Sequence, residues 1–341
     1  MQDPADTTRR CLLQRATHTI ALGTLGLASM KASASSRSIS PPAFGPLRRV
    51  DAGDLRVGYV ELGALDAKPV ILLHGWPYDI HSFAEVGPAL AAKGFRVIVP
   101  YLRGFGPTRF VSSDVARNGQ QAVLAVDVIA LMDALRISNA IIGGFDWGAR
   151  TANIVAALWP ERCRAMVSVS GYLITSRAAN RKSLAPEAEL AWWYLFYFAT
   201  ERGRDGYSAH RREFARLIWR SASPKWNFDA ATFDRSAVAL DNPDHVDVVI
   251  HNYRWRIGLA AGEARYDGLE DRLAALPVIA TPTITLEGDA NAAPHPTRDS
   301  YAHRFVGPVS HRLVTGGIGH NLPQEAPKAF VDAIVDADGY R

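Results

Sequence analysis

The sequence predicts an α/β fold in which helices flank a mostly parallel sheet. Most candidate strands are short, continuous apolar runs, the pattern typical of strands that are buried on both faces. Segments with a helical spacing of apolar residues alternate with these runs, as they do in parallel α/β proteins. The alternation stops over residues 172–276, a block rich in aromatic residues that we expect to be helical throughout.

Seven strands are expected along the chain. They cover residues 55–61, 69–74, 95–100, 139–145, 165–170, 281–287 and 309–315. The helices expected between and after them include 119–135, 148–158 and 325–336. In the first of these helices, Leu124, Val128, Leu131 and Leu135 share one face because they recur at intervals of three and four residues.

Composition excludes several classes of protein. The 341 residues are 48% hydrophobic and 21% charged, with a formal net charge of +4. No Lys/Arg run carries interleaved aromatic residues, so we expect no nucleic-acid partner. No apolar run approaches the roughly 20 residues of a membrane span. The two cysteines, Cys11 and Cys163, cannot build a disulfide framework or a thiolate metal site, and no metal or cofactor is expected.

The first 34 residues resemble an export signal. Arg9-Arg10 precede a weakly apolar stretch and the site Ala32-Ser33-Ala34, which is typical of signal-peptide cleavage. A twin-arginine signal implies passage through the Tat export machinery and a periplasmic or secreted mature protein that begins near Ser35. The alternative is a disordered basic tail. Residues 35–50 are rich in Ser and Pro and are interpreted as a linker.

The stretch "GGFDWG", residues 143–148, places an acid in a tight turn between a strand and a helix. A small-x-nucleophile-x-small turn is a nucleophile elbow, in which glycines allow a strained turn to hold one side chain above the sheet. The amino terminus of the following helix keeps a carboxylate ionised at this point. Asp146 is therefore predicted to be a nucleophile. The alternative is that it only caps the helix.

Two further segments support the elbow. His320 lies in the Gly-rich segment "GGIGHNLPQE", and Asp289 follows the strand "TITLEG". The order Asp146, Asp289, His320 is nucleophile, acid, histidine, with each residue at the carboxyl end of a predicted strand. Asp289 is predicted to orient His320, although a Gly-x-x-Asp spacing would place the acid where this chain has Asn291.

A turn after the second strand completes the predicted site. In "HGWP", residues 74–77, the backbone N–H of Trp76 is expected to lie beside the nucleophile. Together with the N–H of Trp147 it would form a two-donor oxyanion hole, each donor contributing about 3–4 kcal/mol in the transition state. The alternative is an ordinary Gly-Pro loop.

The motifs "HGWP", "LRGFG", "GFDWG" and "GHNLPQE" resemble those of the α/β-hydrolase superfamily, in particular its epoxide hydrolase and haloalkane dehalogenase branch with an Asp nucleophile. The resemblance extends from about residue 55 to 337. It implies an α/β-hydrolase core made of residues 51–171 and 277–341, with residues 172–276 inserted as a helical cap between the strands counted as 6 and 7 in that fold.

The resemblance also implies a mechanism. Asp146 would attack an sp³ carbon to give an alkyl ester, and water activated by His320 would hydrolyse that ester. Epoxide hydrolases of this fold protonate the epoxide oxygen with two cap tyrosines. Tyr194 in "AWWYLFYF" and Tyr253 before Arg254 match their positions, and each could instead be a packing residue.

Epoxide opening to a diol is the favoured function, with a small, mostly apolar substrate and water as reactants. The substrate pocket is expected to include His74, Trp192 and Tyr197. The runner-up is a haloalkane or haloacid dehalogenase, in which Trp147 and a second donor such as Trp76 or Trp192 would hold the halide. "DWGAR" also partly resembles the "DRGAR" of haloacetate dehalogenases, with Arg150 matching. A third hypothesis is a non-catalytic ligand-binding protein that retains the fold.

Overall fold

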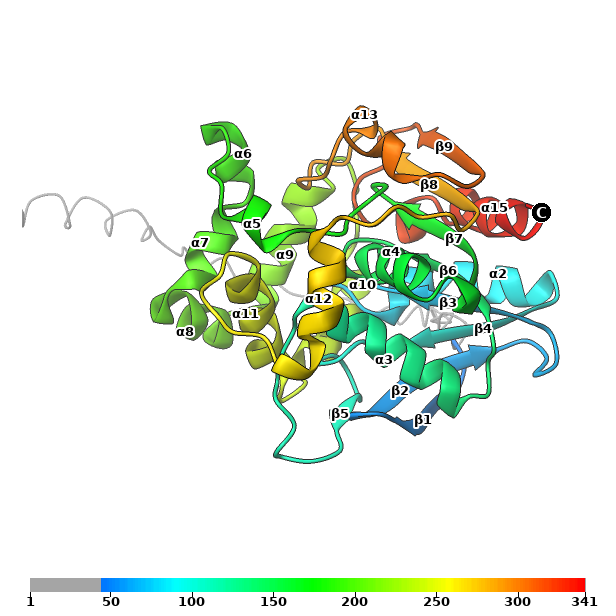
Figure 1. The fold of residues 1–341 in the computed structure, drawn as a ribbon, viewed down its shortest axis with the longest axis horizontal. Coiled ribbons are helices and arrows are strands. Elements are labelled where there is room, and N and C mark those ends of the chain that lie inside the picture. Colours follow the sequence, from blue (N-terminus) through cyan, green and yellow to red (C-terminus); the bar gives the residue numbers. More distant parts are fainter. Residues whose placement is uncertain (1–43, 341) are drawn as a thin grey trace, which may run out of the picture. The chain divides into compact units, whose positions relative to one another are not determined.

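The computed structural model describes residues 44–340, so the predicted export signal and most of the predicted linker lie outside the described residues. Within these residues, nine strands form one sheet in the order β1-β2-β4-β3-β6-β7-β8-β9, with β5 paired to β2 (Figure 1). The strands are β1 (Leu47–Ala52), β2 (Leu55–Leu62), β3 (Lys68–Leu73), β4 (Phe95–Pro100), β5 (Arg109–Phe110), β6 (Ala140–Gly144), β7 (Cys163–Val169), β8 (Thr283–Gly288) and β9 (Val309–Val314).

The pairing confirms the expected, mostly parallel α/β architecture. Strands β4, β3, β6, β7, β8 and β9 pair parallel with one another in that order, whereas β2 pairs antiparallel with β1, β4 and β5. The interpretation of residues 47–50 as linker is wrong, because they belong to β1 and pair with β2. This strand is mostly exposed, so its sequence lacks the continuous apolar run that marks the other strands.

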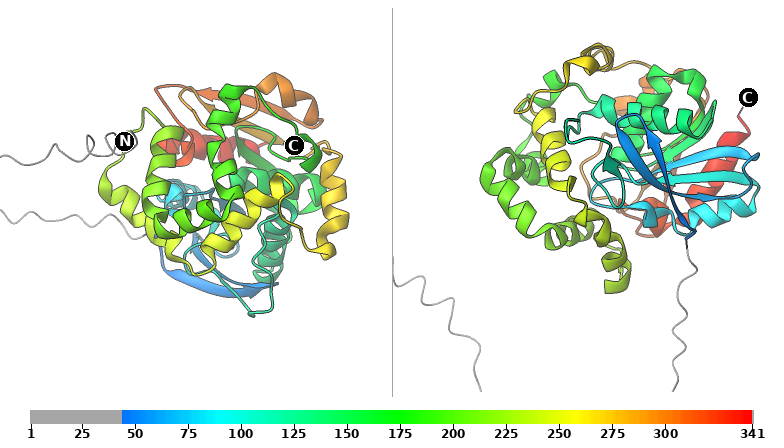
Figure 2. Two further views of the ribbon diagram at one scale, coloured as in Figure 1. Left: turned by 90° about the vertical axis from the view of Figure 1, so that its left-hand side faces the viewer. Right: turned by 90° about the horizontal axis from the view of Figure 1, so that it is seen from below.

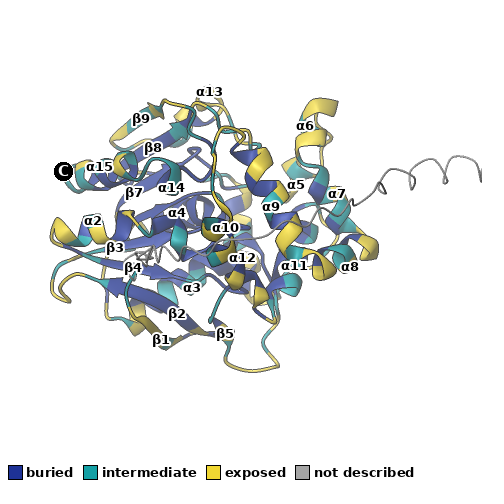
Figure 3. Ribbon diagram, turned by 180° about the vertical axis from the view of Figure 1, so that it is seen from behind, coloured by how far each residue is buried: buried dark blue, intermediate teal, exposed yellow. Residues whose placement is uncertain are grey.

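Helices cover the sheet on both faces. The helices of the core are α2 (Val86–Ala92), α3 (Gln121–Ala134), α4 (Trp147–Leu158), α13 (Arg298–Tyr301), α14 (Leu322–Glu325) and α15 (Pro327–Asp338). Helices α3 and α4 contact each other in one layer, while α2 and α15 contact each other in a second layer. The expected apolar face of α3 packs inward, with Leu124, Val128 and Leu131 fully buried and Leu135 partly buried. The continuous dark-blue sheet in Figure 3 is the resulting core.

The aromatic block between β7 and β8 is helical, as the sequence indicated. Its helices are α5 (Arg177–Asn180), α6 (Pro186–Ala191), α7 (Trp193–Ala199), α8 (Glu201–Ala209), α9 (Arg211–Ala222), α10 (Ala230–Ala237), α11 (His245–Arg256) and α12 (Asp267–Ala274). Single 3₁₀ turns occupy Ile80–Phe83, Pro160–Arg162, Val238–Asp241, Ala264–Tyr266 and Ala302–Arg304.

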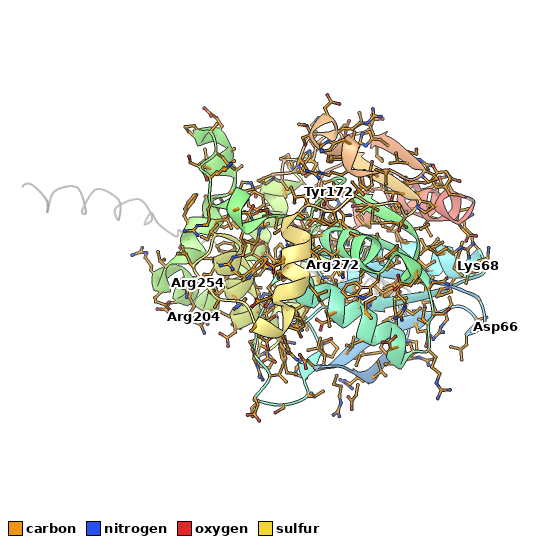
Figure 4. All side chains as sticks on the ribbon, in the orientation of Figure 1. Asp66, Lys68, Tyr172, Arg204, Arg254 and Arg272 are labelled. Atoms are coloured by element: carbon orange, nitrogen blue, oxygen red, sulfur yellow. The ribbon has the colours of Figure 1, made fainter. Side chains whose placement is uncertain are left out.

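Most of these inserted helices gather at one end of the sheet, which the left panel of Figure 2 views face on. We call α5 to α11 the cap. Parallel strands bring the loops after β3, β6, β8 and β9 to the same edge of a sheet. Lys68, where β3 begins, lies at the opposite end from the cap residues Arg204 and Arg254 (Figure 4). No helix within residues 44–340 is both long enough and apolar enough to cross a membrane.

Candidate active site

Asp146 lies at a strained turn between β6 and α4. Its backbone angles are φ 52° and ψ −121°, a conformation that costs a residue with a side chain of order 1–3 kcal/mol. The neighbouring glycines allow the turn to close, because a Cβ on Gly148 would lie 1.9 Å from the carbonyl oxygen of Leu73. Strain at one acidic residue, between two close backbone approaches, is the geometry of a nucleophile elbow rather than of an ordinary helix cap.

Two backbone N–H groups face the Asp146 carboxylate. The N–H of Trp76 donates to Oδ1 at 2.7 Å, and the N–H of Trp147 lies close enough to the carboxylate to lower its pKa. Burial raises the pKa of Asp146, but the close approach and charge of His320, the charge of Arg150 and the Trp147 N–H together lower it. The carboxylate is therefore ionised at neutral pH, as a nucleophile must be. The same two donors would hold the carbonyl oxygen of an ester formed on this residue.

His320 faces the other carboxylate oxygen, with Nε2 3.6 Å from Oδ2 of Asp146. The loop after β9 that carries His320 is tied down from two sides. The backbone N–H of His320 donates to Oγ of Ser223, at the end of α9, and that hydroxyl donates to Glu325. Glu325 also accepts the N–H of Gly319 at 2.7 Å. One loop and one cap helix therefore fix the histidine together.

The third member of the site is Asn291. Its Oδ1 lies 3.2 Å from Nδ1 of His320, and its amide nitrogen donates to Oε1 of Glu287 at 2.8 Å and to Oγ of Ser170 at 3.2 Å. Because the amide N–H₂ is held by two acceptors, the amide oxygen is directed to the histidine. His320 is thus oriented by the neutral amide oxygen of Asn291, and the carboxylate of Glu287 in turn holds the amide nitrogen of Asn291.

The prediction that Asp289 orients His320 is wrong. The Asp289 side chain is exposed, and its carboxylate accepts the backbone N–H groups of Gly316, Gly317 and Ile318 at 2.8–3.0 Å. These bonds, that of Gly316 above all, lower the pKa of Asp289. Asp289 therefore shapes the loop between β9 and His320, and does so without touching the imidazole.

The two predicted tyrosines come together above the elbow. Tyr194 of α7 and Tyr253 of α11 lie with ring centroids 5.4 Å apart, and both rings contact Trp76, at 5.4 and 5.1 Å. Tyr253 also lies 6.0 Å from the Trp147 ring. Burial raises the pKa of both hydroxyls, and the charge of Asp146 acts in the same direction. Both tyrosines are therefore protonated and can donate.

Trp76 is held from the cap. Its indole N–H donates to the hydroxyl of Tyr207 at 2.8 Å, and that hydroxyl lies 2.8 Å from Nε2 of His245. The other ring nitrogen of His245 lies 2.9 Å from the carbonyl oxygen of Gly104. Because Nδ1 donates to this carbonyl, Nε2 is the acceptor of the Tyr207 proton. A buried chain from the core to α8 and α11 thus fixes the oxyanion turn.

The three residues expected to line the substrate pocket lie in three different surroundings in the structure. His74 is fully buried, with Nδ1 2.9 Å from the carbonyl oxygen of Gly75 and Nε2 accepting the N–H of Leu102, so the pocket assignment of His74 is wrong. Tyr197 stacks on Phe214 within the cap. Trp192 contacts Tyr194 and lines a cavity beside the site, and its place in a substrate pocket stays a prediction.

Sequence reasoning missed the roles of Asn291 and Tyr207. Asn291 had a signal, since it occupies the slot where a Gly-x-x-Asp spacing places an acid. Tyr207 gave none. It reaches the site only through the packing of the cap, which helical periodicity does not specify.

Comparison with known proteins agrees with this geometry. Residues 68–210 match the family described as alpha/beta hydrolase fold. A Klebsiella pneumoniae protein, whose crystal structure is described as that of a candidate epoxide hydrolase, is 60% identical to this chain. It superposes with a TM-score of 0.86 over 87% of this chain and 98% of that one. The chain belongs to the α/β-hydrolase family.

Other relatives of this α/β hydrolase carry two activities in their names. Epoxide hydrolase B of Mycobacterium tuberculosis is 34% identical over 146 residues, or 39% of this chain and 40% of that protein. A haloalkane dehalogenase of Mycobacterium marinum is 33% identical over 131 residues, 37% of this chain and 42% of that protein. Each match spans about two fifths of the relative's length. The expectation that the chain is an enzyme of the α/β-hydrolase family is confirmed.

Proposed function

We propose that this α/β hydrolase opens epoxides to diols through a covalent ester on Asp146. The observation that carries the proposal is the pair of buried, protonated tyrosines, Tyr194 and Tyr253, that face the nucleophile from the cap. An epoxide oxygen needs a proton as its ring opens, and a general acid placed there contributes roughly 10²–10⁴-fold to the rate.

In the first step, an Asp146 carboxylate oxygen attacks one oxirane carbon. The C–O bond of the ring breaks, and the departing oxygen takes a proton from Tyr253 or Tyr194. The product is an alkyl ester of Asp146 bearing a neighbouring hydroxyl group. The ionised state of Asp146, held by His320 and the elbow N–H groups, supplies the attacking electron pair.

In the second step, His320 takes a proton from water as the water oxygen attacks the carbonyl carbon of the ester. The negative charge moves to the former carboxylate oxygen, where the N–H groups of Trp76 and Trp147 donate to it. Collapse of this intermediate breaks the ester bond, and the departing alkoxide takes the second proton of the former water, which gives the diol and restores the Asp146 carboxylate. The proton held by His320 then returns to the tyrosinate through solvent.

The second candidate is halide displacement by the same nucleophile. One observation favours it: the indole Nε1 of Trp147 is buried beside the Tyr253 hydroxyl and forms no hydrogen bond of good geometry among the described residues, so it can donate to a leaving halide. The second halide donor is missing at Trp76, whose indole N–H is held by Tyr207. The free donor of Trp147 serves an epoxide oxygen equally well, and the tyrosine pair has no task in halide release.

A single turnover in H₂¹⁸O tests the covalent step. Styrene oxide, with enzyme in excess, is expected to give a diol without the label and one labelled oxygen in the peptide that contains Asp146. The His320→Gln variant should instead accumulate a peptide heavier by the mass of the epoxide. A labelled diol with an unlabelled peptide after repeated turnovers contradicts the ester. Bromide release from 1-bromobutane at a rate above that of diol formation would favour dehalogenation.

A further inference from the structure

Two arginines beside the active site are buried and form no ion pair with any residue that the structure describes. Arg150 lies on α4, one helical turn after Asp146, and is 9% exposed, while Arg256, the last residue of α11, is 8% exposed. Cations as deeply buried as these are normally paired with an anion, because the loss of hydration is otherwise uncompensated. Such an anion is therefore expected among the contacts of the two guanidinium groups.

Neither guanidinium finds an anionic partner in the described part of the chain. Arg150 donates from Nε to the carbonyl oxygen of Leu173 at 3.1 Å; the charge of Asp146 raises the pKa of Arg150, but the Asp146 carboxylate contacts His320 and forms no ion pair with Arg150. Arg256 lies over the ring of Trp192, 4.7 Å from its centroid, and its buried Nε has no hydrogen-bond partner. Stacking on an aromatic ring leaves the donors in the guanidinium plane free for a ligand.

The two charges also act on each other. Burial is the main reason why the pKa of Arg150 falls to about 10, and the charge of Arg256 is the next largest cause. Two like charges brought together in a site of low polarity destabilise one another. An anion bound between them would relieve both the repulsion and the missing hydration.

A cavity of about 460 Å³ opens at these residues. Its wall includes Arg150, Arg256 and Trp192, together with Tyr172, which Figure 4 shows between the sheet and the cap. The described residues around it include no Asp or Glu. A second cavity, of about 540 Å³, shares Leu184, Trp192 and Arg256 with the first. The space is large enough for a small organic ligand. The formal charges of the first cavity are positive, and the second cavity adds Arg181, Lys182 and one acid, Glu189.

The cavity lies next to the groups that would open an epoxide. Trp192, in its wall, is 5.7 Å from Tyr194 between ring centroids, and Arg256 lies 5.8 Å from the ring of Tyr253. A substrate whose reacting carbon lies at Asp146 can therefore reach the two guanidinium groups with another part of the same molecule.

We propose that Arg150 and Arg256 bind a carboxylate group of the substrate, so that the preferred substrates are epoxides bearing a carboxylate near the ring. This inference rests on the proposed function. It revises the expectation of a mostly apolar substrate, which the aromatic cap had suggested. Guanidinium groups match the planar carboxylate with parallel N–H···O bonds, and such charge-assisted bonds are the stronger class.

Two matched epoxides test the proposal with the full-length enzyme. The compound trans-3-phenylglycidate carries a carboxylate, and 3-phenylglycidamide replaces it with a neutral amide of nearly the same shape. The enzyme is expected to show a kcat/KM at least tenfold higher for the carboxylate, mainly through a lower KM. Arg256→Gln should reduce this ratio by about tenfold to a hundredfold, the effect of losing one charge-assisted contact. Arg256→Lys should restore part of the ratio.

Two further variants separate binding from folding. Arg202→Gln removes the same charge from an exposed position on α8 and should leave the ratio at its wild-type value. Leu184→Asp adds a negative charge to the exposed wall of the cavity while both arginines remain, and should lower the ratio even if Arg256→Gln fails to fold. Equal kcat/KM values in the wild type, or a preference that survives Arg256→Gln, overturn the carboxylate site while epoxide opening stands.

Conversion of neither epoxide would instead contradict the proposed function. The carboxylate site is then decided by calorimetry with phenylacetate and phenylacetamide as probes. Tighter binding of phenylacetate that is lost in Arg256→Gln supports the site, and equal or absent binding of the two probes overturns it.

Discussion

The Nδ1 of His320 lies 3.2 Å from the Oδ1 of Asn291, and the amide nitrogen of Asn291 lies 2.8 Å from a carboxylate oxygen of Glu287. The histidine is therefore oriented by an amide, and a carboxylate holds that amide in place. An amide oxygen fixes the ring and selects the tautomer with Nε2 free to accept a proton. It brings no full negative charge to the imidazolium that forms during catalysis.

Replacing Asn291 by Ala is expected to slow ester hydrolysis more than ester formation. The imidazole loses the acceptor that orients it, and general base catalysis is worth roughly 10²–10⁴-fold. Since attack by Asp146 does not require the base, the alkyl ester should accumulate during turnover. Rapid-quench mass spectrometry of the Asp146 peptide measures this. A variant that forms the ester slowly but hydrolyses it at the wild-type rate would contradict the role of Asn291.

Introducing the acid that is usual in such sites should not improve the enzyme. Asn291→Asp would direct a carboxylate at Glu287, and two carboxylates in contact cannot both ionise without cost. We expect a lower Tm for this variant, and a recovery when Glu287→Gln is added, because Gln supplies the missing donor. A double-mutant cycle on Tm and kcat measures the coupling, and strictly additive effects would show that the two side chains do not interact.

Asp289 is expected to matter for stability and much less for turnover. Asp289→Asn should lower Tm at neutral pH, because the N–H groups of Gly316, Gly317 and Ile318 lose a charged acceptor. Backbone hydrogen bonds lower the pKa of this carboxyl, so its stabilising effect is present above its ordinary pKa and is lost as the pH falls through the lowered value. The Tm difference between the two proteins should therefore shrink below about pH 4. If Asp289→Asn lowered kcat as much as Asn291→Ala does, Asp289 would have to take part in catalysis, contrary to this assignment.

The contrast between Asp289 and Asn291 shows where sequence reasoning succeeds. The elbow could be predicted because glycines, an acid and a helix start lie within six residues, 143–148, and because the conformation is local. Asp289 and Asn291 both follow β8 closely, and either could face His320. The loop that contains Gly316 and Gly317 decides between them, because it directs three backbone N–H groups toward Asp289. This arrangement depends on backbone angles that the amino-acid sequence does not specify.

The cap was predictable as helical but not as a set of contacts. Tyr194 and Tyr253 were identified through resemblance to known motifs, whereas Arg256 follows Tyr253 by only three residues and carried no motif. Its importance comes from burial beside Arg150, which lies 106 positions earlier on another helix (256 minus 150). Charge compensation across such separations is visible only once the chain is folded.

The cap tyrosines should control epoxide opening. Tyr253→Phe and Tyr194→Phe are each expected to slow ester formation, with a loss of roughly 10²-fold or more for the principal acid. Tyr197→Phe is the matched control, because Tyr197 packs within the cap against Phe214. Since burial raises the pKa of both site tyrosines well above 10, their ionisation should cause no loss of rate up to about pH 10. Stopped-flow tryptophan fluorescence in single turnovers measures the step. Wild-type rates in both Phe variants would remove the tyrosines from the mechanism.

The chain from Trp76 through Tyr207 to His245 should stabilise the cap on the core. Tyr207→Phe leaves the indole N–H of Trp76 and the Nε2 of His245 without partners in a buried place. Each unpaired group costs about 1–3 kcal/mol, so a loss of about 2–6 kcal/mol in the free energy of unfolding is expected for the two. Urea unfolding measures it, with Tyr197→Phe again as control. A loss below 0.5 kcal/mol, taken roughly as the effect of a neutral surface change, would show that the chain contributes little.

His245 should make the protein sensitive to acid. Burial lowers the pKa of His245 to about 3 in the folded protein, against 6.5 in an unfolded chain. As the pH falls below 6.5, the unfolded state takes up a proton that the folded state refuses, so acid favours unfolding. The stabilising effect of a neutral His245 is complete above pH 6.5 and declines between 6.5 and 3, by at most about 1.4 kcal/mol per pH unit. His74, whose pKa burial also lowers, acts in the same direction. Urea unfolding at several pH values should show that the free energy of unfolding declines less steeply with falling pH in His245→Gln than in the wild type. Equal slopes would mean that His245 can be protonated in the folded protein without a cost in stability.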